Sequence, residues 1–163
     1  MSYAELTLKF TNLPLRFPVK AMELVERYTQ TKRANDDDAR GGDFKPFERF
    51  VDLWWAALCV GVREGRRTTE AECGGWHKFI DSNQILPSDP WRAEHLMLLA
   101  VGVTGNTEIL DRPTQIIEMA NEFAATGYGV LVEAMAADSR PIRGATTFLL
   151  AKSGTNQVGQ QSD

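Results

Sequence analysis

One segment limits the possible folds of this chain more than any other. From residue 46 to residue 65, large apolar side chains recur at steps of three and four residues, and further apolar residues fill much of the opposite side. This spacing predicts a helix, and a helix that is apolar nearly all round is buried on most faces. Trp54 and Trp55 lie within it, and each indole N–H needs a hydrogen-bond partner when it is buried. We therefore expect a mainly α fold, a single-domain helical bundle around this buried central helix.

Three other segments predict helices that pack against the central one. Apolar residues have helical spacing near residues 19–29, 90–103 and 113–136, and a proline stands close to the start of each segment. A glycine at position 105 is expected to end the second of them. The last segment contains Gly127 and a further glycine two residues later, which leaves two possibilities open: one bent helix, or two helices joined near Gly127.

Two short stretches have the character of β-strands. Residues 4–10 alternate apolar and polar side chains, and residues 146–150 form a late β-like run. We expect these two stretches to form a small two-stranded β pair that brings the ends of the domain together. The aromatic and aliphatic residues within 76–80 instead indicate a helical turn that packs back on the core.

Length and composition predict one globular domain over residues 1–152. The chain has 163 residues, of which 43% are hydrophobic, enough to bury a core. Residues 30–45 are almost free of apolar side chains and predict a mobile acidic loop, and the polar residues 153–163 predict a disordered tail. No apolar run approaches the roughly 20 residues that span a bilayer, and no signal peptide is visible. The two cysteines form no disulfide framework, so we expect a cytoplasmic protein that does not contact membranes.

No enzyme signature stands out in the sequence. It has no phosphate-binding loop and no dinucleotide fingerprint, and its histidines lack the neighbouring ligands of a metal site, so we expect no cofactor and no metal. Cys59 falls inside the most apolar helix, where a thiol is usually inert packing. Cys73, His77 and Asp81 are the residues that a small hydrolase or nuclease would use. We keep that reaction class as an alternative and lean against catalysis.

A cluster of arginines follows the central helix. Arg63, Arg66 and Arg67 lie at its C-terminal end, where cations complement the helix dipole. They are surrounded by glutamates with which they can pair, and we favour that structural interpretation. The alternative is that they bind a DNA backbone together with Lys78 and Arg92. The net charge of −4 argues against a surface that holds nucleic acid non-specifically but not against a local basic patch.

Three motifs within residues 47–135 resemble one known family. They are the Gly61–Thr68 turn, the Thr107–Leu110 step, and the Ala120–Phe123 segment with Gly127–Gly129 after it. In this combination the chain resembles the small helical proteins associated with Dnd gene clusters, the fourth such family. Those bacterial clusters modify DNA by phosphorothioation and restrict unmodified DNA.

The resemblance implies a biological setting and no reaction, because the family is named for its gene neighbourhood. It implies a non-catalytic accessory component of a bacterial DNA modification, restriction and antiviral defence system, acting through contacts with a protein partner from that complex. Direct binding to the DNA backbone and a small hydrolase or nuclease activity are the two alternatives.

Overall fold

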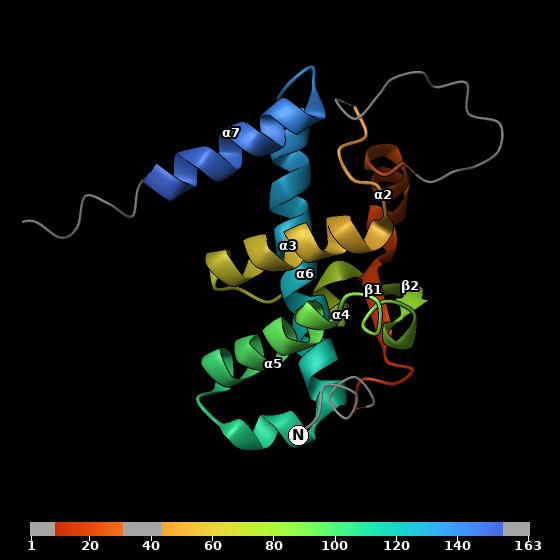
Figure 1. Cartoon of the computed structure of the whole chain (residues 1–163). Helices are drawn as coiled ribbons and strands as arrows, with labels where there is room; N and C mark the ends of the chain where they lie inside the picture. The colour runs from red at the N-terminus through yellow and green to blue at the C-terminus, as the bar shows by residue number, and fades with distance from the viewer. Residues whose placement is uncertain (1–8, 31–43, 155–163) are drawn as a thin grey trace, which may run out of the picture.

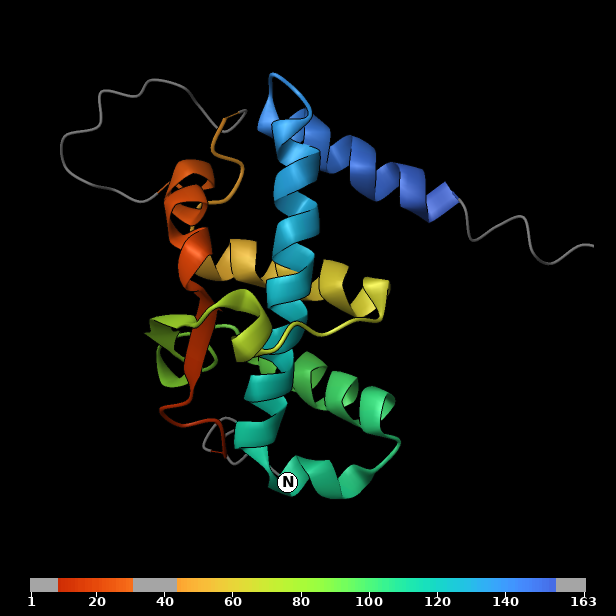
Figure 2. The same ribbon diagram turned by 180° about the vertical axis from the view of Figure 1, so that it is seen from behind.

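The axis of the fold is a 24-residue helix, α6, which spans Pro113–Ala136. The computed structural model describes residues 9–30 and 44–154. Figure 1 shows that α3 crosses α6, that α5 and α7 project from one side of α6, and that α2 and the β pair lie on its other side. The view from behind shows the same arrangement (Figure 2). The mainly α bundle predicted from the sequence is therefore confirmed.

The remaining elements are all shorter than α6. In chain order they are β1 (Pro14–Pro18), a 3-10 turn (Val19–Ala21), α2 (Met22–Tyr28), α3 (Phe50–Glu64), α4 (Glu70–Cys73), β2 (Trp76–Asp81), a second 3-10 turn (Ser82–Gln84), α5 (Pro90–Thr104), a third 3-10 turn (Thr107–Asp111) and α7 (Pro141–Gly154). Among the described helices, none is long and apolar enough to cross a membrane.

The predicted central helix is α3, and its partner in the core is α6. Two glycines let the backbones of these helices meet. A Cβ atom added at Gly61 would collide with the carbonyl oxygen of Phe123, and one added at Gly127 would collide with the carbonyl oxygen of Ala57. Gly127 therefore does not divide the helix, and of the two possibilities left open by the sequence the structure has one continuous α6. Its role is to permit close approach.

A buried amide joins α6 to α3 and to the β pair. Asn121 on α6 is 2% exposed. Its Oδ1 accepts hydrogen bonds from Trp54 Nε1 at 3.2 Å and from the backbone N–H of Arg16 at 2.9 Å. Its Nδ2 donates to the carbonyl oxygen of Pro14 at 3.0 Å. Asn121 is thus the partner that the buried indole of Trp54 requires.

The β pair exists, but its strands are not the predicted ones. β1 pairs with β2 in antiparallel orientation, with Leu15 opposite Ile80 and Phe17 opposite His77. The expected helical turn over 76–80 is wrong, because these residues form a strand along β1 instead. Residues 146–150 belong to α7 and not to a strand. Most of the other predicted strand, residues 4–10, lies outside the described residues.

The other predicted helices agree with the structure within a few residues. The 19–29 segment is the first 3-10 turn followed by α2, and the 90–103 segment is α5. Gly105 ends α5 in the left-handed conformation, with φ of 66°, as expected for a glycine at this position. The predicted acidic loop at 30–45 and the predicted tail at 153–163 fall almost entirely outside the described residues.

Candidate protein-contact surface

An exposed aromatic cluster connects α3 to α5. The Trp55 and Trp91 rings meet edge to face with their centroids 5.2 Å apart, and the His95 ring lies 5.6 Å from Trp91. Trp91 is 42% exposed. Leu98, one further turn along α5, is 69% exposed. We call the surface formed by Trp55, Trp91, His95 and Leu98 the aromatic face.

A buried arginine packs against the two tryptophan rings of the aromatic face. Arg92 is only 5% exposed, and its Cζ lies 5.3 Å from the centre of the Trp55 ring and 4.9 Å from that of Trp91. Its Nη2 donates to Asp52 Oδ1 at 2.8 Å. Its Nε lies 3.4 Å from Asp89 Oδ2, an ion pair without hydrogen-bond geometry. These contacts fix α5 to α3 by charge and by cation–π attraction.

Asp52 on α3 is the acceptor at the centre of this network. Partial burial by itself would raise the pKa of its carboxyl group. Hydrogen bonds from Arg49 and Arg92 outweigh that effect, so the pKa of Asp52 lies below its ordinary value. The carboxylate therefore stays ionised, and it links two guanidinium groups from different parts of the chain.

Arg92 is thus placed differently from the other residues of the predicted DNA site. Its guanidinium is buried against carboxylates and indole rings, so it offers no donors to a phosphate backbone. Lys78, also predicted for that site, lies on β2, where its Nζ is 2.7 Å from Asp81 Oδ2. The structure does not bring these two cations together with the arginines at the C-terminal end of α3 into one described cluster.

The arginines at the C-terminal end of α3 are exposed, and two of them are paired. Arg66 lies 4.0 Å from Glu72 with 70% of its side chain exposed, and Arg67 lies 3.4 Å from Glu122 with 50% exposed. Arg63 instead has its Cζ 5.1 Å from the centre of the Phe148 ring. Carboxylates accompany this cluster, so the described surface here is mixed in charge and not a basic patch.

The residues of the alternative catalytic site make separate contacts. Cys73 Sγ lies 3.4 Å from the carbonyl oxygen of Glu70, within its own helix turn. His77 is exposed on β2, and Asp81 pairs with Lys78. In the described part of the chain, no hydrogen bond or ion pair joins these three side chains to one another. In the same part, no three His, Cys, Asp or Glu side chains gather as a metal ion would require.

Cys59 is not packed inside the core as expected. It is exposed on α3, because α6 covers only one side of that helix. Trp55 and Ala56 on the same outer side are half-buried. Burial by neighbouring atoms still raises the pKa of the Cys59 thiol. The expectation that α3 is buried on most faces therefore fails on this outer side.

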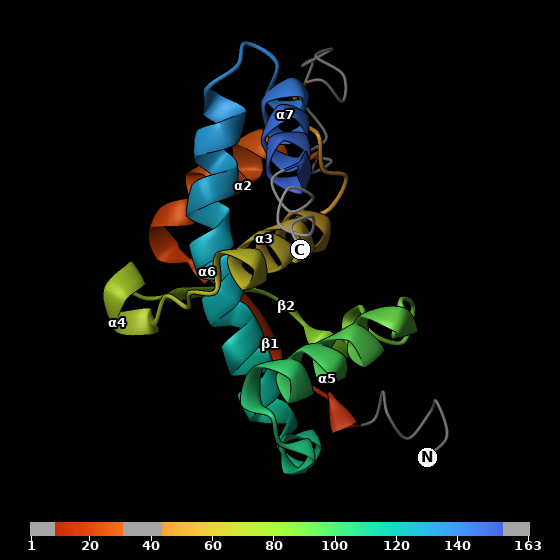
Figure 3. The ribbon, with the colours of Figure 1, turned by 90° about the vertical axis from the view of Figure 1, so that its left-hand side faces the viewer.

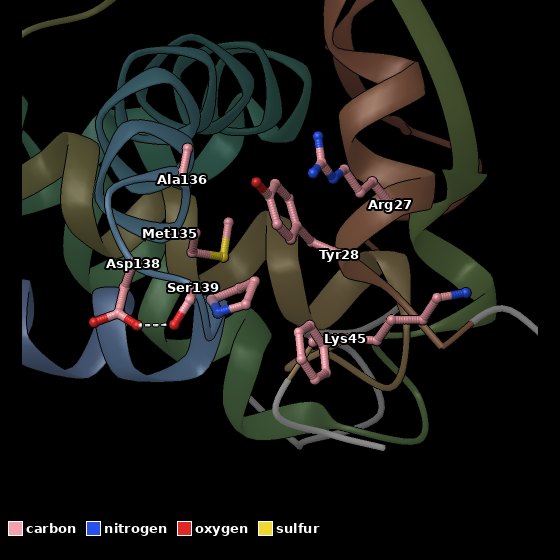
Figure 4. A pocket seen from close by; sticks show the side chains of 9 residues that line it. Arg27, Tyr28, Lys45, Met135, Ala136, Asp138 and Ser139 are labelled. Carbon is pink, nitrogen blue, oxygen red and sulfur yellow. Dashed lines mark hydrogen bonds between the residues drawn. The ribbon is translucent and has the colours of Figure 1, made fainter. Parts of the chain in front are cut away.

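A polar cavity of about 560 Å³ lies between α2 and the turn that joins α6 to α7. Figure 4 shows Arg27 and Lys45 on one side of it, with Asp138 and Ser139 on the other. Asp138 already accepts a hydrogen bond from Arg143 Nε at 2.6 Å, which keeps the pKa of that carboxyl low. Cations on one wall and a paired carboxylate on the other indicate no single class of ligand.

Comparison with family models, with curated proteins and with solved structures found no match to this chain. The resemblance to the Dnd-associated family therefore stays a prediction.

The sequence reasoning missed the aromatic face, although a signal for it was present. Trp91, His95 and Leu98 have the spacing of one side of a helix, the pattern also expected of core residues. Periodicity could place them on a common side of α5, but it could not show that this side stays uncovered.

Proposed function

We propose that this chain is a non-catalytic binding protein that contacts a protein partner through its aromatic face. The observation that supports this most directly is the exposure of Trp91 and Leu98 on one side of α5. Contiguous exposed apolar side chains mark interaction sites, and tryptophan is enriched among the residues that dominate binding energy.

The aromatic face is also held in place before any partner binds. Arg92 and Asp52 tie α5 to α3 with a 2.8 Å ion pair, and the Trp55 and Trp91 rings pack against the same guanidinium. A surface whose side chains are already ordered loses less conformational entropy on association. The network thus favours binding without providing any group for catalysis.

The resemblance supplies the class of partner that we propose. It suggests a protein of a bacterial DNA modification and restriction complex. Direct DNA binding is the weaker alternative, because Arg66 and Arg67 face glutamates and Arg92 is buried.

The test is a native pulldown of the tagged full chain from its own host, with identification of the captured proteins by mass spectrometry. We expect a DNA modification or restriction protein to co-purify with the wild type and to be lost from Trp91→Ala and Leu98→Asp. Val19→Asp is the matched control, because Val19 is 51% exposed and lies away from α5. Capture of no such protein, or equal capture by all variants, would refute the proposal.

A further inference from the structure

A second surface is an apolar groove on the outer side of α3, next to α7. It has a volume of about 360 Å³. Its lining residues come from the segment before α3 and from α3, α6 and α7, and they are Phe47, Ala56, Cys59, Val60, Arg63, Leu131, Ala145 and Leu149. We call it the α3–α7 groove. Figure 3, which looks onto the projecting helices, shows α7 above α3 and α5 below it.

The groove exists because α7 packs against α6 through small residues. Gly144 and Ala145 are buried there, and a Cβ atom added at Gly144 would collide with the carbonyl oxygen of Ala134. Two larger apolar side chains of α7 are not buried against α6: Leu149 is 41% exposed and Leu150 is 67% exposed. Among the residues that the structure describes, apolar side chains of α7 therefore stay exposed beside α3.

Arg63 gives this groove a charge. The Cζ atom of its guanidinium lies 5.1 Å from the centre of the Phe148 ring. Arg66 and Arg67 each have a carboxylate partner, whereas the described residues provide none for Arg63. A cation beside apolar walls acts through a lower effective dielectric than a cation in open water. A carboxylate brought next to Arg63 would thus be attracted more strongly than a carboxylate next to an arginine at an ordinary surface site.

We infer that the α3–α7 groove binds an amphipathic helix of a partner protein, with an apolar stripe in the groove and a carboxylate against Arg63. Helices α3 and α7 both pack on α6, and a groove between two helices is the kind of surface that takes an apolar helix face. The otherwise apolar lining disfavours a DNA backbone, because Arg63 is the one charged donor among its described residues and most phosphates would lose water there without gaining a hydrogen bond. This inference goes beyond the proposed function and does not depend on the aromatic face.

The test is a display selection of random 16-residue peptides on the immobilised full chain, followed by affinity measurements. We expect the enriched peptides to have apolar residues at helical spacing and at least one Asp or Glu. Arg63→Glu should weaken their binding about tenfold, as close interfacial charge pairs do. A peptide with Lys in place of its carboxylate should recover affinity for Arg63→Glu. Arg112→Glu is the charge-matched control, because Arg112 is exposed at the far end of α6.

A second variant and a labelling experiment keep the result interpretable. Leu149→Asp, verified as folded by circular dichroism, should abolish binding, and bound peptide should slow alkylation of Cys59 by N-ethylmaleimide. The inference is overturned by a selection that enriches nothing, by enriched peptides that lack carboxylates, or by peptides that bind Arg63→Glu as tightly as the wild type. None of these outcomes affects the pulldown with the aromatic-face variants, so the two proposals fail separately.

Discussion

The contact between α3 and α6 makes the substitution Gly127→Ala a severe test of the structure. A Cβ atom at this position would overlap the carbonyl oxygen of Ala57 and approach the backbone of Gly61. These are backbone atoms, so no side-chain rotation can relieve the overlap. The two helices would have to move apart by about 1 Å or more, and gaps of that size forfeit a quarter to a half of each dispersion contact across the interface.

The expected loss can be set against the gain in helix propensity. Overpacking a tight core costs about 1–3 kcal/mol and occasionally more, whereas replacing glycine by alanine inside a helix gains up to about 1 kcal/mol. Because the overlap is with backbone, we expect the upper end of that range, a net destabilisation of about 2–3 kcal/mol. For a chain of this size, that lowers Tm by roughly 4–12 °C.

Gly129 provides the control two residues away on the same helix. A Cβ atom there would meet nothing within 4 Å, so Gly129→Ala should keep or raise the stability through propensity alone. The assay is thermal and urea unfolding followed by circular dichroism at 222 nm. If Gly127→Ala unfolds at the same temperature as Gly129→Ala, the close crossing of α3 and α6 is incorrect.

Four further outcomes follow from the charged and thiol groups. Arg92→Met should destabilise the fold by about 2 kcal/mol, because it leaves the partly buried Asp52 carboxylate with fewer partners. In a double-mutant cycle measured by urea unfolding, adding Asp52→Asn to Arg92→Met should cost little further stability. If the two substitutions have simply additive effects, the pairing of Arg92 with Asp52 is contradicted. Since the folded pKa of Asp52 is lowered, its stabilisation is complete above the unfolded value of about 4 and is lost as pH falls through the folded pKa. On acidification, the unfolding free energy should therefore fall less steeply in Asp52→Asn than in the wild type. Parallel curves of unfolding free energy against pH would contradict the lowered pKa of Asp52. Alkylation of Cys59, followed by mass spectrometry, should have its pH midpoint above that of a free cysteine, because neighbouring atoms raise the pKa of its thiol; a midpoint below that of a free cysteine would contradict the raised pKa. Retention of the chain on a DNA column at low salt should be weak and should not depend on Arg66 and Arg67; salt-sensitive retention that is lost in Arg66→Ala/Arg67→Ala would favour the DNA alternative.

The main helices could be predicted from the sequence because their signals are local. The apolar spacing of residues 50–64 and the proline that begins α5 act within a few residues of the chain, and so does the glycine that ends α5. The need of the Trp54 indole for a partner was also predictable from its chemistry. The identity of that partner was not predictable, because Asn121 lies 67 residues away in the chain.

Which surfaces stay open and which strands pair depends instead on contacts between distant parts of the chain. The run at residues 146–150 has β-like side chains, yet it continues a helix that docks through Gly144 and Ala145. Periodicity assigns residues to one side of a helix but does not say whether another element covers that side. For this reason Arg92 proved to be buried and Trp91 exposed on the same helix. Both outcomes depend on Asp52 and Trp55 of α3, which the fold brings to α5 from about 40 residues earlier in the chain.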